Sequence, residues 1–166
     1  TAEIAVQAAL TGHLVLSTLH TNSAMGAIVR LINMGVEPYL ITASVVGVLA
    51  QRLVRQLCGD CKQPLSAEQA RAAAASLSVA PTGEATLYKP VGCASCRNTG
   101  YRGRVAIHEL LRLTDEVKQQ VLERGTAVHG AQGAYVGGNL LQDGATKVFS
   151  GLTTAEEVLR VARQHD

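Results

Sequence analysis

All four cysteines of the chain fall into two Cys-x-x-Cys pairs, Cys58/Cys61 and Cys93/Cys96. Because two residues between thiolates let one tight turn direct both sulfurs at a single ion, two such pairs complete the tetrahedral shell that structural Zn²⁺ prefers. The 31 residues between the pairs, 62–92, exceed the usual zinc-ribbon spacing, so we expect a ribbon that carries an insertion. Four sulfurs leave no open position for water, so we expect a structural rather than a catalytic metal.

Two disulfides are the alternative use of the same four residues. They require an oxidising compartment, whereas no signal peptide is recognisable and the sequence is typical of an intracellular protein. We therefore favour zinc, or a zinc module that has lost its metal, over a disulfide scaffold.

The composition favours an aliphatic interior. Of 166 residues 47% are apolar, but the chain has one Phe, four Tyr and no Trp. Such a core suits an α/β or α-rich fold, and the length fits one domain or part of a larger one. The net charge of +2 is too slight to indicate a polyanionic partner by itself. The most apolar run, 39–50, is shorter than the about 20 residues that span a bilayer, so we expect no direct membrane insertion.

Helical and strand patterns alternate over the first third of the chain. We expect a helix over 2–10 that stops at Gly12, then a buried strand of a parallel sheet over 14–19. Side chains at 21–23 offer N-cap chemistry for a helix that Gly35 closes. Because one strand makes no sheet, this order implies an α/β sheet whose other strands lie outside the chain.

A long helix is expected next, from about residue 39 to residue 57, leading directly into the first cysteine pair. On such a helix Arg52 and Arg55 lie one turn apart and share a face.

Capping signals and Gly or Pro breaks delimit the remaining elements. The expected segments, in order, are a helix over 66–77, a break at 81–83, a strand over 104–111, a helix over 114–125, a loop over 130–139, and helices over 140–150 and 154–163. Ser66 and Gln69 form a capping box for the first of these helices, and Thr153 and Glu156 form one for the last.

A polar cluster, residues 17–22, follows the expected strand. In open α/β sheets ligands bind at the carboxyl ends of strands, where a histidine such as His20 can contact a phosphate oxygen or orient an attacking water. The neighbouring hydroxyl and amide side chains can complete a phosphate-facing group. The alternative is a loop whose polar groups cap the next helix, and on spacing alone this alternative is favoured.

Three longer segments carry a family resemblance. TAEIAVQAALTGHLVLSTLHTNSA resembles the His-box region of the secretion and pilus-assembly ATPases, a RecA-like hexameric family. GVEPYLITASVVGVLAQRLVRQLCGDC with CASCRNTGYRGRVAIHELL is similar to their tetracysteine module, and QDGATKVFSGLTTAEEVLRV to their C-terminal helices. The sequence of residues 34–39 resembles the type II secretion assembly ATPases most, and the type IV pilus extension ATPases next.

This resemblance implies a role for each matching residue. His20 corresponds to the histidine that faces the nucleotide phosphates, as a catalytic sensor or water-orienting group. Thr18, Thr21 and Asn22 are implied as supporting contacts to the nucleotide. The implied zinc ligands are Cys58, Cys61, Cys93 and Cys96.

The resemblance also implies a fold and a cellular setting. The chain is expected to be the C-terminal portion of a RecA-like P-loop ATPase: core with His box over 1–57, tetracysteine zinc subdomain over 58–104, and C-terminal strand and helices over 105–166. The family is cytoplasmic, hexameric, dependent on ATP and Mg²⁺, and peripheral to the inner membrane through the secretion platform proteins. It couples ATP hydrolysis to extrusion of a pseudopilus or pilus, and no nucleic acid is expected as partner.

The nucleotide cradle itself is missing from the sequence. A P-loop needs Gly-x-x-x-x-Gly-Lys-Ser/Thr, and none of the lysines follows a glycine; they are Lys62, Lys89, Lys118 and Lys147. The acidic Walker-B strand is expected just ahead of residue 1. Because positioning of Mg²⁺ and the phosphates supplies most of phosphoryl-transfer catalysis, we expect this chain alone to hydrolyse no ATP.

Two further interpretations remain open at this stage. His108 beside Glu109 could serve as a fifth metal ligand or an acid/base pair, although local hydrogen bonding at a strand edge is favoured. Arg102 and Arg104 could meet phosphate, an acidic face of the next subunit, or water, and the subunit face ranks first.

A zinc ribbon that binds RNA or DNA is the function from another class. Basic residues around Tyr101 favour it, since the ring could stack on a base. The near-neutral charge and the shortage of aromatic residues disfavour it.

Overall fold

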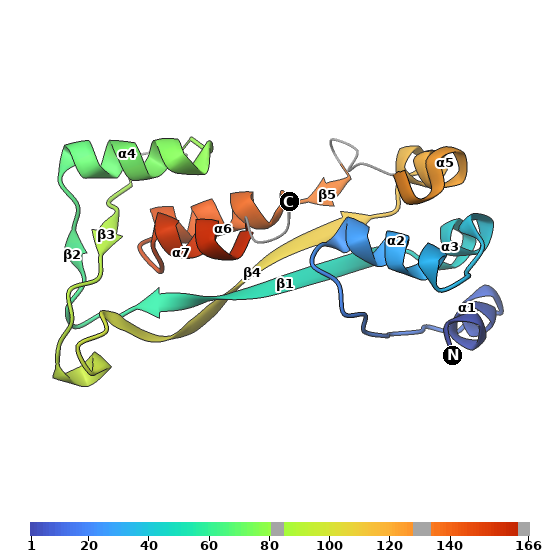
Figure 1. Ribbon diagram of the computed structural model, residues 1–166, viewed down its shortest axis with the longest axis horizontal. Helices are drawn as coiled ribbons and strands as arrows, with labels where there is room; N and C mark the ends of the chain where they lie inside the picture. Colours follow the sequence, from blue (N-terminus) through green and yellow to red (C-terminus); the bar gives the residue numbers. More distant parts are fainter. Residues whose placement is uncertain (81–84, 128–133, 163–166) are drawn as a thin grey trace. The chain divides into compact units, whose positions relative to one another are not determined.

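The computed structural model describes residues 1–80, 85–127 and 134–162 as a mixed α/β fold. The chain divides into two compact units, one formed by Thr1–Ala50 and Glu109–Gly137, the other by Gln51–His108 and Gly138–Asp166. Two long strands, β1 (Gly47–Leu57) and β4 (Tyr101–Arg112), contribute residues to both (Figure 1). The division into three parts expected from the sequence stays a prediction.

Helices predominate in the first unit, and short-range caps fix their ends. Its elements are α1 (Ala2–Leu10), α2 (Ala24–Asn33), α3 (Pro38–Ser44), α5 (Asp115–Arg124), the 3₁₀ turn η2 (Gly125–Ala127) and β5 (Tyr135–Val136). Ser23 Oγ accepts a hydrogen bond from Gly26 N at 3.0 Å, and Thr114 Oγ1 accepts one from Val117 N at 3.5 Å. The helices expected over 2–10, after 21–23 and over 114–125 are confirmed, the last two together with their side-chain caps.

The core of the first unit is aliphatic, as the composition predicts. Its largest fully buried side chains are Ile28, Ile41, Leu111, Val117 and Val121. Strand β5 pairs antiparallel with β4 through Leu110↔Val136 and Leu111↔Tyr135. The expected 130–139 loop therefore contains a short strand, and residues 130–133 lie outside the described part of the chain.

The second unit holds both cysteine pairs and the C-terminal helices. Its elements, besides parts of β1 and β4, are β2 (Gln63–Pro64), α4 (Ala67–Leu77), β3 (Tyr88–Lys89), the 3₁₀ turn η1 (Ala94–Cys96), α6 (Leu140–Phe149) and α7 (Ala155–Ala162). Strand β2 pairs antiparallel with β3. The capping box of Ser66 and Gln69 is confirmed at the start of α4, and the break expected at 81–83 lies outside the described residues.

Two aliphatic clusters stabilise the second unit. One consists of Leu77, Leu87, Ala145, Val148, Ala155 and Val158, and the other of Val54, Ile107, Leu140 and Val161. Helices α6 and α7 pack closely, because a Cβ on Gly144 would lie 2.4 Å from Val158 Cγ1. The helices expected over 140–150 and 154–163 are confirmed within the described residues.

The strand expected over 14–19 is wrong. These residues are extended without regular secondary structure, and Leu14 and Leu16 are each 88% exposed. A strand needs neighbours for its N–H and C=O groups, and no strand in the described ranges pairs with this segment. The apolar pattern therefore indicated a buried strand, but no strand of the described residues pairs with this segment.

The long helix expected over 39–57 is also wrong in its larger part. Helix α3 ends at Ser44 and strand β1 begins at Gly47. Along β1 more buried and more exposed side chains alternate, and its backbone hydrogen-bonds to β4. Arg52 and Arg55 therefore do not share a helix face, since residues three apart on a strand point to opposite sides.

The capping box expected from Thr153 and Glu156 is wrong, because Thr154 supplies the side-chain cap of α7. Thr154 Oγ1 accepts a hydrogen bond from Glu157 N at 3.3 Å, whereas Thr153 Oγ1 donates to Arg55 O at 2.8 Å. Adjacent threonines offer the same capping group, so only the tertiary contact of Thr153 decided which one caps α7.

Candidate functional site

Two tight turns at the ends of the long strands present the cysteines. Cys58 follows β1 directly, and Lys62 N donates to Cys58 O at 3.0 Å in the first turn. Cys93 is the N-cap of η1 and Cys96 is its last residue, and Asn98 N donates to Cys93 O at 2.8 Å. Because Cys58 N also donates to Gly100 O at 3.0 Å, the two turns are held side by side.

The four sulfur atoms match the geometry of a tetrahedral metal site. All four Sγ atoms lie within 4.8 Å of one another. The Sγ–Sγ distances are 3.9 Å for Cys58–Cys93, 3.9 Å for Cys61–Cys96 and 3.7 Å for Cys93–Cys96. Zinc–sulfur bonds of about 2.3 Å place tetrahedral sulfurs about 3.8 Å apart. The donor set therefore fits a metal ion of the zinc type, and all four cysteines are free rather than disulfide-bonded.

Backbone amides supply a second set of contacts to the sulfurs. Gly92 N donates to Cys61 Sγ at 3.3 Å, and both Cys93 N and Gly100 N donate to Cys96 Sγ at 3.2 Å. Burial raises the pKa of the Cys96 thiol, but these two amides, together with hydrogen bonds to the thiols of Cys93 and Cys61, outweigh it and lower the pKa to about 6. Burial raises the pKa of Cys61 to about 11 against the Gly92 amide. The site thus stabilises a thiolate at Cys96 even before a metal contributes.

Glycine is required at the second turn. Gly100 has φ +75°, and a Cβ there would lie 2.4 Å from Pro90 Cβ. Any side chain would therefore push the second turn away from the residues beside it.

The tetracysteine segment is attached to the turn between α6 and α7. Lys62 Nζ donates to Gly151 O at 2.8 Å and lies 4.4 Å from the centroid of the Tyr88 ring. Leu57 N donates to Leu152 O at 2.8 Å. These contacts join the first cysteine turn to residues far along the chain, since Lys62 and Gly151 are 89 positions apart.

A buried acid completes this attachment. Glu157 is 2% exposed and accepts hydrogen bonds from Arg55 N, Arg55 Nη2 and the guanidinium of Arg160. Sequence reasoning missed Glu157, although one signal was present. An acidic residue stands on the apolar stripe that Val158 and Val161 define on α7, and such a position favours a buried, paired carboxylate.

His108 on β4 contacts an acid of α6 that lies 35 residues later in the sequence. Its backbone N donates to Asp143 Oδ2 at 2.8 Å, and its Nδ1 lies 3.9 Å from the same oxygen. In the described residues the group of potential metal ligands consists of the four cysteines, so the fifth-ligand interpretation is not supported.

The residues of the His-box segment (17–22) precede α2, which begins at Ala24. Thr18 and His20 are exposed, and Thr21 is half-buried. Thr21 Oγ1 donates to Ser23 O at 3.2 Å. Thr18 and His20 present their hydroxyl and imidazole groups at the surface, and the nucleotide-contacting roles of Thr18, His20, Thr21 and Asn22 stay predictions.

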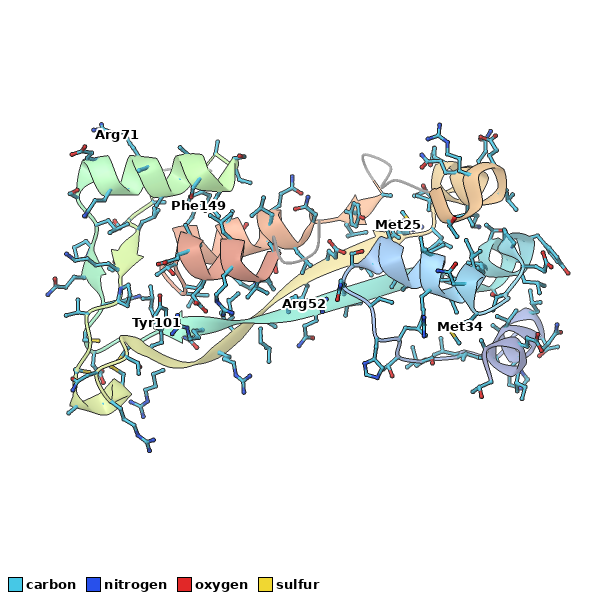
Figure 2. All side chains as sticks on the ribbon, viewed as in Figure 1. Met25, Met34, Arg52, Arg71, Tyr101 and Phe149 are labelled. Carbon is cyan, nitrogen blue, oxygen red and sulfur yellow. The ribbon has the colours of Figure 1, made fainter. Side chains whose placement is uncertain are left out.

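Tyr101, by contrast, has neighbours of its own. The Arg55 guanidinium lies 4.1 Å from the centroid of its ring, and its hydroxyl lies 3.2 Å from Thr154 Oγ1. The aromatic face that a nucleobase could use therefore contacts Arg55 (Figure 2 labels Tyr101 near the start of β4).

Among the described helices none combines the length and apolarity needed to cross a bilayer.

Known proteins match the chain over nearly its full length. Residues 1–160 match the family described as type II/IV secretion system protein. A type II secretion system protein E of Pectobacterium carotovorum subsp. carotovorum is 51% identical, the match covering 99% of this chain and 32% of the relative. For a type II secretion system ATPase E of Vibrio cholerae serotype O1 the identity is 48%, with 99% and 32% covered.

A pilus protein is similar to almost the same degree. The type IV pilus assembly ATPase PilB of Myxococcus xanthus is 48% identical, the match covering 96% of this chain and 29% of the relative. The chain thus spans about a third of the length of these relatives. The resemblance predicted from the three sequence segments is confirmed, and the chain belongs to the type II/IV secretion system protein family.

Proposed function

We propose that this chain is the C-terminal part of an ATPase that powers pseudopilus assembly for type II protein secretion. The match of 99% of the chain to type II secretion proteins, one of which is named an ATPase, is the observation that carries this proposal. The proposed fold is a RecA-like core whose nucleotide cradle lies in the remaining part of the full-length protein. ATP and Mg²⁺ are its proposed cofactors there.

The four cysteines are proposed to bind one structural Zn²⁺. The Sγ–Sγ distances of 3.7 to 3.9 Å and the amide donors to Cys61 and Cys96 support this role. The site joins the two turns that end β1 and precede β4, so the ion would fix the register of these strands near the cysteines.

His20 is proposed to contact the nucleotide phosphates, with Thr18, Thr21 and Asn22 in support. An exposed imidazole beside hydroxyl groups can donate to a phosphate oxygen or orient the attacking water. The chain alone is proposed to be inactive, because its sequence has no P-loop.

The full-length protein is proposed to work as a cytoplasmic hexamer, peripheral to the inner membrane through platform subunits of the secretion system. A type IV pilus extension ATPase is the second candidate, favoured by the 48% identity to PilB. A nucleic-acid-binding ribbon is disfavoured, because Arg55 already stacks on the only aromatic ring of the second cysteine turn and β4 start.

Steady-state ATP hydrolysis tests the proposal. We expect the full-length protein to be active, the chain of residues 1–166 to be inactive, and His20→Ala to lower kcat on the order of 100-fold. His13→Ala is the matched control, since His13 is an exposed histidine seven positions earlier and outside the His-box segment. Hydrolysis by residues 1–166 at the full-length rate would overturn the proposal that the nucleotide cradle lies elsewhere in the full-length protein. An unchanged kcat in His20→Ala would overturn the role of His20.

A further inference from the structure

A buried acid from β4 holds the first residue of α2. Glu109 is 6% exposed, and its Oε1 accepts a hydrogen bond from Ala24 N at 2.7 Å across 85 residues of sequence. Ala24 is itself fully buried. The contact is short for an amide–oxygen pair, as expected where the acceptor is a carboxylate.

The two caps at this helix end divide the available donors. The first amides of a helix have no partner inside it, and Ser23 Oγ takes the amide of Gly26 while Glu109 takes that of Ala24. A carboxylate there also meets the positive end of the helix dipole. Tyr135 pairs with Leu111, two residues after Glu109 on β4, and burial and then the negative charge of Glu109 raise the pKa of Tyr135. The carboxylate is thus enclosed by packed groups of the first unit.

This contact matters for the segment that precedes α2. Residues 14–20 have no regular secondary structure and are exposed, so burial fixes little of this stretch. Ala24 is four positions after His20, and it is the first residue of this stretch that is both buried and held by a distant element. The position of the His20 backbone therefore depends on where α2 begins.

The same contact limits how a phosphate can be bound here. A helix N-terminus with open amides attracts anions, but a carboxylate already accepts from the first amide of α2. A phosphate approaching that amide would also meet the like charge of Glu109. A nucleotide phosphate would therefore contact the side chains of the His-box segment rather than the first amide of α2.

We propose that Glu109 is the positioning residue of the His-box segment, holding the first residue of α2 so that His20 meets the nucleotide at a fixed place. The proposal rests on the function proposed above for His20. Glu109 touches no reacting atom and acts only through the segment that it holds.

Four variants of the full-length protein test this role: Glu109→Ala, Glu109→Gln, His20→Ala and the double variant Glu109→Ala/His20→Ala. We expect Glu109→Ala to lower kcat on the order of 10-fold with KM for ATP changed less than about twofold, because a small misplacement of a reacting group costs rate. Glu109→Gln should recover most of the loss, since its amide oxygen accepts the same hydrogen bond. The exposed Glu123→Ala on α5 is the matched control.

The double variant separates positioning from general stability. If Glu109 acts through His20, the double variant has the kcat of His20→Ala alone. Multiplied losses, or no recovery in Glu109→Gln, would overturn the proposal. Hydrogen exchange of the Ala24 amide is read in parallel and should accelerate in Glu109→Ala; unchanged exchange would overturn the contact itself. A normal kcat in His20→Ala combined with faster exchange at Ala24 would overturn both the function of His20 and the positioning role built on it, while leaving the hydrogen bond standing.

Discussion

The carboxylate of Glu157 binds both the main chain and the side chain of Arg55. Its Oε2 accepts from Arg55 N at 3.1 Å and its Oε1 from Arg55 Nη2 at 2.6 Å, across 102 residues of sequence. The strand β1 that ends at the first cysteine turn is thereby attached to the C-terminal helix α7. One side chain thus satisfies a strand amide and two guanidinium groups, those of Arg55 and Arg160.

Replacing this acid should destabilise the protein. We expect Glu157→Ala to lower the free energy of unfolding by about 2 to 3 kcal/mol, because hydrogen bonds to charged groups are lost at a buried position. Urea denaturation measures the loss. The control is Glu156→Ala, which removes the neighbouring acid of the same helix, outside the buried group; an equal loss there would contradict the special role of Glu157.

The same carboxylate should make stability depend on acid pH. Burial raises the pKa of Glu157, but hydrogen bonds from Arg55 and Arg160 outweigh it and lower the pKa to about 2. A pKa lower in the folded than in the unfolded chain contributes stability that is fully present above about pH 4.5 and is lost as the pH falls toward about 2. We expect urea midpoints to fall through this window, and to fall less steeply in Glu157→Gln. Parallel curves for both proteins would contradict the assignment.

Removing the metal should loosen the cysteine turns. We expect one zinc per chain, and we expect a strong chelator or Cys96→Ser to release it and expose 58–65 and 88–100 to proteolysis. Metal content by elemental analysis, thiol titration and limited proteolysis measure the effect. Ser95→Ala is the matched control, since Ser95 is an exposed residue of the same 3₁₀ turn. Four reactive thiols without metal in the untreated protein would contradict the zinc assignment.

The contact between α6 and α7 should not tolerate a methyl group. A Cβ on Gly144 would lie 2.4 Å from Val158 Cγ1, and Val158 is fully buried. Although alanine favours helices, we expect Gly144→Ala to destabilise by about 1 to 2 kcal/mol through overpacking. Thermal or urea unfolding measures the change.

Shortening the partner provides the control for that substitution. In a protein that already carries Val158→Ala, the smaller side chain at 158 leaves space for a methyl group at 144. Adding Gly144→Ala to that protein should therefore leave the free energy of unfolding unchanged or raise it. The same loss in both backgrounds would show that the cost does not come from this contact.

Features governed by near neighbours could be predicted from the sequence. The Cys-x-x-Cys spacing lets one turn gather two sulfurs, and the capping box of Ser66 and Gln69 closes within three residues. The helix after Thr114 follows from the same kind of local hydrogen bond. Because turns and caps involve residues close in sequence, they can be predicted without knowledge of the fold.

Pairing with distant residues decided the rest. Residues 47–57 contain Leu, Arg, Gln and Ala, all good helix formers, yet they form β1 because β4 offers a strand to pair with. Residues 14–19 have a strand pattern and no partner strand in the described ranges. An extended segment satisfies its backbone only through neighbours, so its state depends on what the fold brings beside it.

The sequence by itself determined the cysteine turns, the helix caps and the aliphatic composition of the core, and it carried the family resemblance. Only the tertiary structure decided that Glu109 holds Ala24 and that Glu157 holds Arg55, across 85 and 102 residues respectively. A buried carboxylate needs donors to offset its lost hydration, and which donors reach it depends on the path of the backbone rather than on neighbouring residues.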